Sequence, residues 1–134
     1  MLNLETFKEK VIEEKQTAAL CFTSSHCPPS LEQIKVINEL KDKYSDKFLI
    51  EIHDIEESAE LAKALRINNL PTTLFFAEGN LQEQNCLYGY QDGSMLTDSF
   101  ECTLWEMENK SNNTKYIWVV IGILLLIAII MAAL

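Results

Sequence analysis

The sequence predicts an α/β domain, with a central mixed β-sheet of about four strands flanked by helices, followed by one C-terminal transmembrane helix. Three observations lead to this fold class. Amphipathic helical patterns alternate with apolar runs of strand length from residue 4 to residue 76, as in parallel crossover units. A turn signal at 78–80 then separates two strand-like runs, as in an antiparallel hairpin. Residues 116–134 carry no charged side chain.

The first half of the chain contains three expected helices and two expected strands. The stripe of Leu4, Phe7, Val11 and Ile12 predicts an amphipathic helix, and the apolar run 17–23 predicts a strand. Residues 30–44 have an apolar face at helical spacing, and residues 48–53 have strand composition. A short helix follows, which we expect Ser58 to cap. This order predicts a parallel strand pair joined by a right-handed crossover.

The second half continues the sheet and then leaves it. Pro71 stands directly before a third strand, 72–76, where its missing N–H donor is tolerated. We expect the next run, up to Tyr88, to return as the second arm of a hairpin, and residues 95–108 to form the last helix of the domain. The predicted organisation is therefore a domain at 1–108, a polar linker at 109–115 and a transmembrane helix at 116–134.

The apolar segment 116–134 has the length and composition of a membrane span. As a helix it reaches roughly 28 Å, which is close to the hydrocarbon thickness of a bilayer. Tyr116 and Trp118 occupy the expected interfacial positions, and Lys110 and Lys115 flank them. The first ten residues show no signal-peptide pattern. We therefore expect a single-pass, tail-anchored membrane protein whose N-terminal domain is cytoplasmic.

Charge and cysteine content exclude several other classes. The formal net charge is −9 and no basic cluster is present, which argues against nucleic acid binding. The four cysteines are widely spaced, unlike those of a secreted disulfide framework. No His/Cys group has the spacing of metal ligands. We expect reduced thiols and no bound cofactor or metal.

The segment Ser25-His26-Cys27-Pro28-Pro29-Ser30 carries the candidate chemistry. Cys27 falls between the first strand and the second helix, so we expect it at the helix N-terminus. There the unpaired N–H groups and the helix dipole favour an anion, and a cysteine supplies a thiolate. The alternative at this point is a buried cysteine in a proline-bounded loop.

Three features of the chain occur together: the segment around Cys27, an Asp at the end of the second strand, and Leu70-Pro71-Thr72 before the third strand. In these features the chain resembles the thioredoxin family, over about residues 17–108. The resemblance implies a thioredoxin-like fold and makes Cys27 the nucleophile. It also implies a cis peptide bond before Pro71, and backbone at Leu70 that meets an extended substrate. Ser30 stands where the family has its second, resolving cysteine, so the usual dithiol cycle is unavailable.

The remaining candidates have subsidiary roles. Ser30 is a candidate hydrogen-bond donor to the Cys27 thiolate, or a plain first-turn serine. His26 is a candidate for activating the thiol, either as a cation or as a base. We interpret Cys21, Cys86 and Cys102 as packing residues, Cys86 on the fourth strand and Cys102 on the last helix. His53 is interpreted as structural.

Two functions fit these residues. The first is a membrane-tethered monothiol thiol–disulfide oxidoreductase that acts on protein thiols or disulfides, with glutathione or another small thiol as co-substrate. The second is a non-catalytic thioredoxin-like adaptor that binds a partner peptide between Cys27 and Pro71. The reactivity of Cys27 separates the two hypotheses.

Overall fold

The computed structural model describes residues 1–134. Its sheet has the strand order β2-β1-β3-β4, with β5 also paired to β3. Strand β1 (Ala18–Thr23) runs parallel to β2 (Leu49–Asp54) and antiparallel to β3 (Thr72–Ala77). The predicted parallel pair and the mixed sheet are thus confirmed. Helices α2 (Pro28–Tyr44) and α3 (Ala59–Ala64) are the predicted second and third helices.

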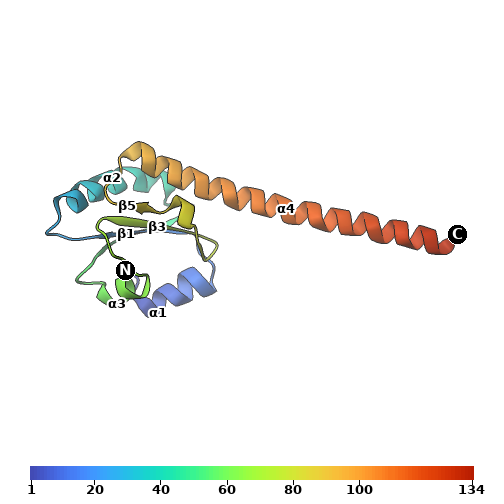
Figure 1. Ribbon diagram of the computed structural model, residues 1–134, viewed down its shortest axis with the longest axis horizontal. Helices are drawn as coiled ribbons and strands as arrows, with labels where there is room; N and C mark the ends of the chain where they lie inside the picture. The colour runs from blue at the N-terminus through green and yellow to red at the C-terminus, as the bar shows by residue number, and fades with distance from the viewer. The chain divides into compact units, whose positions relative to one another are not determined.

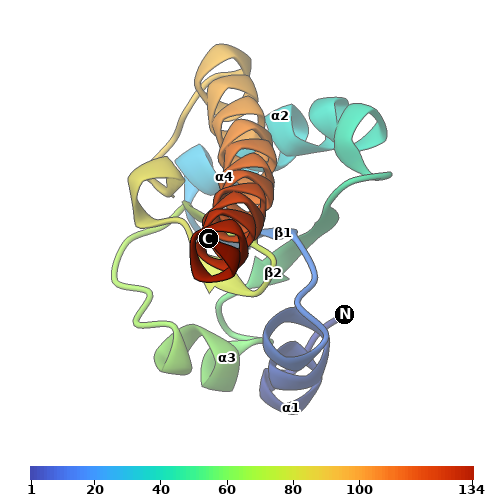
Figure 2. The same cartoon turned by 90° about the vertical axis from the view of Figure 1, so that its right-hand side faces the viewer.

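Helices cover both faces of this sheet, as Figure 1 and Figure 2 show. One face packs on the first helix and α3 through a cluster that includes Phe7, Val11, Phe22 and Leu61. The other face packs on α2 and on the start of α4 (Gly93–Ala133) through a second cluster. Every residue of β1 is buried, because this central strand is covered on both faces. The chain therefore has two apolar cores, one on each side of a shared sheet.

Several predicted element boundaries were wrong. The first helix consists of α1 (Leu4–Phe7) and a π-helical continuation, η1 (Lys8–Glu13). The hairpin arm expected up to Tyr88 divides into β4 (Asn80–Leu81), the 3-10 turn η2 (Glu83–Asn85) and β5 (Leu87–Tyr88). Cys86 consequently lies between η2 and β5 and not on a strand. The hairpin turn requires Gly79, whose φ is +84° and where a Cβ would come within 2.8 Å of the Val11 carbonyl oxygen.

The C-terminal part of the chain is one helix. The first turns of α4 bury Leu96 and Phe100 in the domain, and the helix continues without a break to Ala133. The polar segment 109–115, expected as a linker, is helical. The apolar end of α4 is long and apolar enough to cross a membrane, with a mean hydropathy of 2.9 over its best window and none of that window buried.

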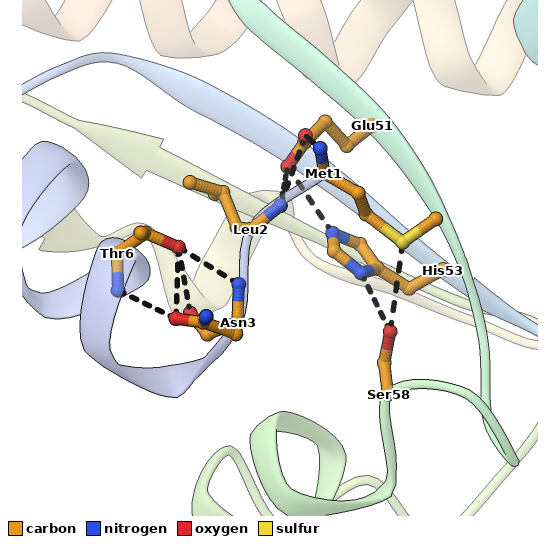
Figure 3. A network of polar contacts seen from close by, with 7 residues as sticks. All are labelled: Met1, Leu2, Asn3, Thr6, Glu51, His53 and Ser58. Atoms are coloured by element: carbon orange, nitrogen blue, oxygen red, sulfur yellow. Dashed lines mark hydrogen bonds and ion pairs between the residues drawn. The ribbon is translucent and has the colours of Figure 1, made fainter.

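A polar network joins the N-terminal segment to β2 on the α1 side of the sheet (Figure 3). Both carboxylate oxygens of Glu51 accept from the Leu2 N–H, at 3.2 and 3.3 Å. The fully buried His53 lies with Nε2 at 3.3 Å from Glu51 and Nδ1 at 3.0 Å from the Ser58 hydroxyl. The structural interpretation of His53 agrees with this placement. Ser58 occupies the N-cap position of α3, as predicted, but makes no side-chain capping bond, and its hydroxyl faces His53 instead.

Glu51 makes this network sensitive to acid. Burial by itself raises the pKa of the carboxyl, but the hydrogen bonds from His53 and Leu2 and the nearby positive charges outweigh it, so the pKa is lowered from its ordinary value of 4.5. A lowered pKa in the folded state stabilises the fold at pH values above the unfolded pKa. This contribution is lost as the pH falls through the folded pKa.

We therefore predict that Glu51→Gln flattens the pH dependence of stability below pH 4.5. Between about pH 5 and about pH 3, the parent chain should lose roughly 1 kcal/mol more free energy of unfolding than the variant. Urea unfolding followed by near-ultraviolet circular dichroism measures this difference. Glu32→Gln is the matched control, because Glu32 is exposed and pairs only with Lys35 at the surface. Equal slopes for the parent and Glu51→Gln would contradict the assignment.

Candidate functional site

Cys27 lies at the N-cap of α2, as predicted. Its backbone is extended, with φ −111° and ψ 108°, and its carbonyl oxygen accepts from the N–H groups of Ser30 at 3.0 Å and Leu31 at 3.2 Å. Pro28 and Pro29 occupy the first two helical positions, where a missing N–H breaks no helical hydrogen bond. The Cys27 sulfur makes no capping bond. It thus remains available for chemistry beside the positive end of the helix.

The segment before β3 faces this thiol. The Leu70–Pro71 peptide bond is cis, and the Cys27 sulfur lies 3.9 Å from the Leu70 carbonyl oxygen. The segment is fixed on both sides: Thr72 Oγ1 donates to the Asn69 carbonyl at 2.7 Å, and the Gly89 N–H donates to the Pro71 carbonyl at 2.7 Å. The structure therefore brings together three of the predicted site residues, Cys27, Leu70 and Pro71, although Cys27 and Leu70 are 43 positions apart in the sequence.

Ser30 lies in the first turn of α2, three residues after Cys27. It is completely buried, and its hydroxyl oxygen has no hydrogen-bond partner. Buried polar groups without a partner are rare in proteins and call for an explanation. The hydroxyl does not bond to the Cys27 sulfur in this structure, so its predicted role as a donor is not visible in the resting geometry.

His26 is at the surface beside the thiol. Its side chain is 80% exposed, and Nε2 lies 3.9 Å from a carboxylate oxygen of Glu56, which is itself 73% exposed. An ion pair this exposed contributes little to stability. The imidazole contacts Glu56 and makes no hydrogen bond to Cys27, so a role in activating the thiol stays a prediction.

Sequence reasoning missed Glu56. The predicted parallel pairing of β1 and β2 could have indicated that Glu56 lies near the site, since Thr23 is in register with Asp54 at the ends of these strands. Because the carboxyl ends of parallel neighbours meet at one edge, the residues after β2 lie beside the loop that carries His26 and Cys27. The Ile55 N–H confirms this by donating to the Thr23 carbonyl at 2.8 Å.

The other three thiols differ from Cys27 in burial. Cys21 is 1% exposed, and burial raises its pKa to about 11 despite a hydrogen bond with Thr73. Burial also raises the pKa of Cys86. Both fit the predicted packing role. Cys102 was predicted wrongly, because it lies on the solvent-facing side of α4 and is exposed. All four cysteines are free thiols, and Cys27 alone combines access with a helix N-terminus.

No group of three or more His, Cys, Asp or Glu side chains is arranged to hold a metal ion. The chemistry that this arrangement supports is nucleophilic attack by one sulfur. The partly buried thiol, the backbone of Leu70 and Pro71 lie together at one edge of the sheet.

Comparison with known proteins gives matches over most of the chain. The thioredoxin family model matches residues 1–101. The chloroplastic M-type thioredoxin of Spinacia oleracea is 32% identical over 100 residues, which are 75% of this chain and 54% of that protein. Thioredoxin H5 of Arabidopsis thaliana is 32% identical over 81 residues, 58% of this chain and 68% of that protein. The chain thus spans about half the length of the spinach relative.

Solved structures share the fold. A thioredoxin of Malassezia sympodialis superposes with a TM-score of 0.67 at 22% identity, over 77% of this chain and 87% of that one. Thioredoxin O2 of Arabidopsis thaliana, in its oxidised state, superposes with a TM-score of 0.64 at 25% identity, over 72% and 83% of the two chains.

Proposed function

Because the chain belongs to the thioredoxin family, we propose that it is a membrane-tethered protein of thiol–disulfide exchange that uses Cys27 as its single reactive cysteine. The observation that carries this proposal is the 3.9 Å approach of the Cys27 sulfur to the Leu70 carbonyl, at the N-terminus of α2. Thioredoxins act on protein disulfides, and members of the family need no cofactor. The substrates are therefore protein thiols or disulfides that reach the domain at the membrane.

The reaction needs one thiolate and one disulfide. The Cys27 thiolate attacks one sulfur of a partner disulfide, a new S–S bond forms, and the other partner sulfur leaves as a thiolate. Leu70 backbone and Pro71 hold the partner segment in an extended form. Ser30 cannot complete a dithiol cycle, because a hydroxyl does not form an S–S bond. A second thiol, such as glutathione, must attack the mixed disulfide and release Cys27.

Ser30 and His26 have supporting roles in this proposal. The unpartnered Ser30 hydroxyl lies in the helical turn that starts at Cys27 and becomes a donor to the sulfur when the thiolate forms. His26 adds positive charge near the sulfur when it is protonated. Its Nε2 lies 3.9 Å from Glu56, a weak and exposed contact beside the loop that carries Cys27.

The proposed tether is the apolar end of α4. We divide the chain into a domain at 1–108, a linker at 109–115 and a membrane helix at 116–134. In this division, the exposed apolar side chains of the last segment contact lipid. Exposure of these apolar side chains to water would cost free energy, since burial of apolar surface contributes roughly 25 cal/mol per Å². We place the N-terminal domain on the cytoplasmic side, where Cys27 stays reduced.

The function is tested by comparing two cysteines of the same chain. In the full chain, held in a non-ionic detergent at pH 7, Cys27 should react with the neutral disulfide bis(2-hydroxyethyl) disulfide roughly tenfold faster than Cys102. Mass spectrometry of tryptic peptides follows both sites in one sample. Access alone would favour Cys102, which is exposed, over Cys27, which is partly buried. A slower or absent reaction at Cys27 would refute the exchange function and favour the non-catalytic adaptor.

Ser30→Ala separates stability from reactivity. Removing a buried hydroxyl that has no partner should leave the free energy of unfolding unchanged or raise it by about 1 kcal/mol. The same change should slow the reaction of Cys27 with the neutral disulfide about threefold to tenfold at pH 7, because the thiolate loses a donor. Ser99→Ala is the control, since Ser99 is another buried serine, on α4. An unaltered rate in Ser30→Ala would show that Ser30 only fills space.

The tether has its own test. The full chain should stay in the membrane pellet after alkaline carbonate extraction, and Cys27 should resist a membrane-impermeant thiol reagent until the cells are opened. Replacing Leu124, Leu125 and Leu126 with Asp, three exposed positions within the apolar segment, should release the chain into the supernatant, because each charge is costly in lipid. Retention of this variant would argue against a span, and labelling of Cys27 in intact cells would place the domain outside the cytoplasm.

A further inference from the structure

An open cavity lies between the residue after β2, helix α3 and the segment that follows α3. Its volume is about 500 Å³, within the range of roughly 300–1,000 Å³ that is usual for small-molecule sites. The walls are mainly apolar and come from Ile55, Ala62 and Ile67, and the polar groups at its edge are Lys63, Arg66 and Asn68. The lining therefore combines apolar walls with a few polar groups at the edge, which suits a small ligand that has both characters.

Two of the residues that line this cavity are neighbours in sequence of residues at the candidate site. Ile55 is followed directly by Glu56, which pairs with His26 at 3.9 Å. Asn68 comes two residues before Leu70, whose carbonyl lies 3.9 Å from the Cys27 sulfur. Two of the lining residues are thus one or two positions along the chain from residues that contact His26 and Cys27.

The cations at its edge have no partners of their own. Neither Lys63 nor Arg66 takes part in any of the four ion pairs of the structure. Arg66 is the only arginine of the chain, in a sequence whose net charge is −9. A guanidinium is suited to bidentate contact with a carboxylate. Two unpaired cations beside an apolar cavity are complementary to a small molecule with carboxylates.

The backbone conformation of Arg66 is a second, independent observation at this cavity. Its φ is +57°, in the left-handed region where glycine or asparagine normally ends a helix. A long side chain in this conformation is energetically unfavourable, and such exceptions gather at ligand sites. The residue ends α3 and also presents its side chain at the cavity.

We propose that this cavity binds the carboxylates of a small acidic thiol, of the glutathione type, which exchanges with Cys27. The inference rests on the proposed function and names the second thiol of the cycle. In the exchange, the Cys27 thiolate attacks one sulfur of the small disulfide, the bond between its two sulfurs breaks, and one thiolate leaves. The reverse step, attack by the small thiolate on the mixed disulfide, uses the same contacts and regenerates the Cys27 thiolate.

The kinetic test compares a charged and a neutral disulfide. The full chain in non-ionic detergent, with Cys102→Ser to remove the other accessible thiol, reacts with glutathione disulfide or with bis(2-hydroxyethyl) disulfide. The double substitution Lys63→Gln and Arg66→Gln should slow the first reaction about threefold to tenfold and leave the second within about twofold. Lys41→Gln is the control, because it removes one exposed charge roughly 20 Å along α2 from Cys27.

The outcomes separate the two proposals. Equal slowing with both disulfides, or no slowing with either, overturns the cavity assignment while the exchange function stands. A parent chain that reacts with neither disulfide overturns the function, and this inference with it.

A binding measurement tests the cavity without any reaction. Because the chain has one arginine, its ¹⁵N spectrum has one Arg Nε–H signal. This signal should shift saturably with S-methylglutathione and not with its diethyl ester, which has no carboxylates. No shift with S-methylglutathione would overturn the proposal. A shift that only an acidic peptide such as acetyl-Glu-Glu-amide produces would also overturn it, in favour of an acidic segment of a partner protein.

Discussion

The hydrogen bonding of β1 on both of its edges determines where the candidate site forms. Its parallel neighbour β2 ends at the same edge of the sheet, which brings Glu56 to His26. Its antiparallel neighbour β3 begins at that edge, which brings Leu70 and Pro71 to Cys27. A sheet with only parallel or only antiparallel pairs would not gather these three segments. The mixed pairing of one buried strand thus assembles the site from three loops.

Burial then divides the four thiols into two classes. Cys21 and Cys86 are packed in the two cores, where loss of solvation disfavours the thiolate and raises the pKa. Cys27 is only half-buried, because the loop after β1 carries it to the N-cap of α2, beyond the buried part of the strand. The same helix buries Ser30, which leaves a hydroxyl without a partner three residues from the sulfur. One loop and one helix turn therefore place a half-buried thiol and a buried hydroxyl close together, and no second thiol lies within that turn.

The net charge of the chain and the proposed membrane tether affect which thiols and disulfides reach the site. The chain is acidic overall, so an acidic small thiol is repelled by most of the surface. Lys63 and Arg66 are an exception, placed at the end of α3 beside the cavity. A membrane tether would restrict protein partners to those at the same bilayer, whereas a small thiol diffuses freely to the cavity. The proposed cycle joins a local protein substrate to a soluble recycling thiol.

The sequence by itself determined the order of helices and strands, the place of Cys27 and the apolar C-terminal segment, because each follows from local periodicity, proline positions or composition. Prediction from the sequence failed where a side chain contacts residues that are distant in sequence and not its neighbours along the chain. Ser58 has the chemistry of a helix cap, yet its hydroxyl faces the buried His53. Cys102 sits in an amphipathic pattern that did not reveal its exposure. The segment 109–115 has linker composition and is helical in the structure, so composition alone did not determine its backbone conformation. The exposure of each thiol, the contact of His26 with Glu56 and the cavity at Arg66 depend on which chain segments meet across the sheet, and only the tertiary structure decides that.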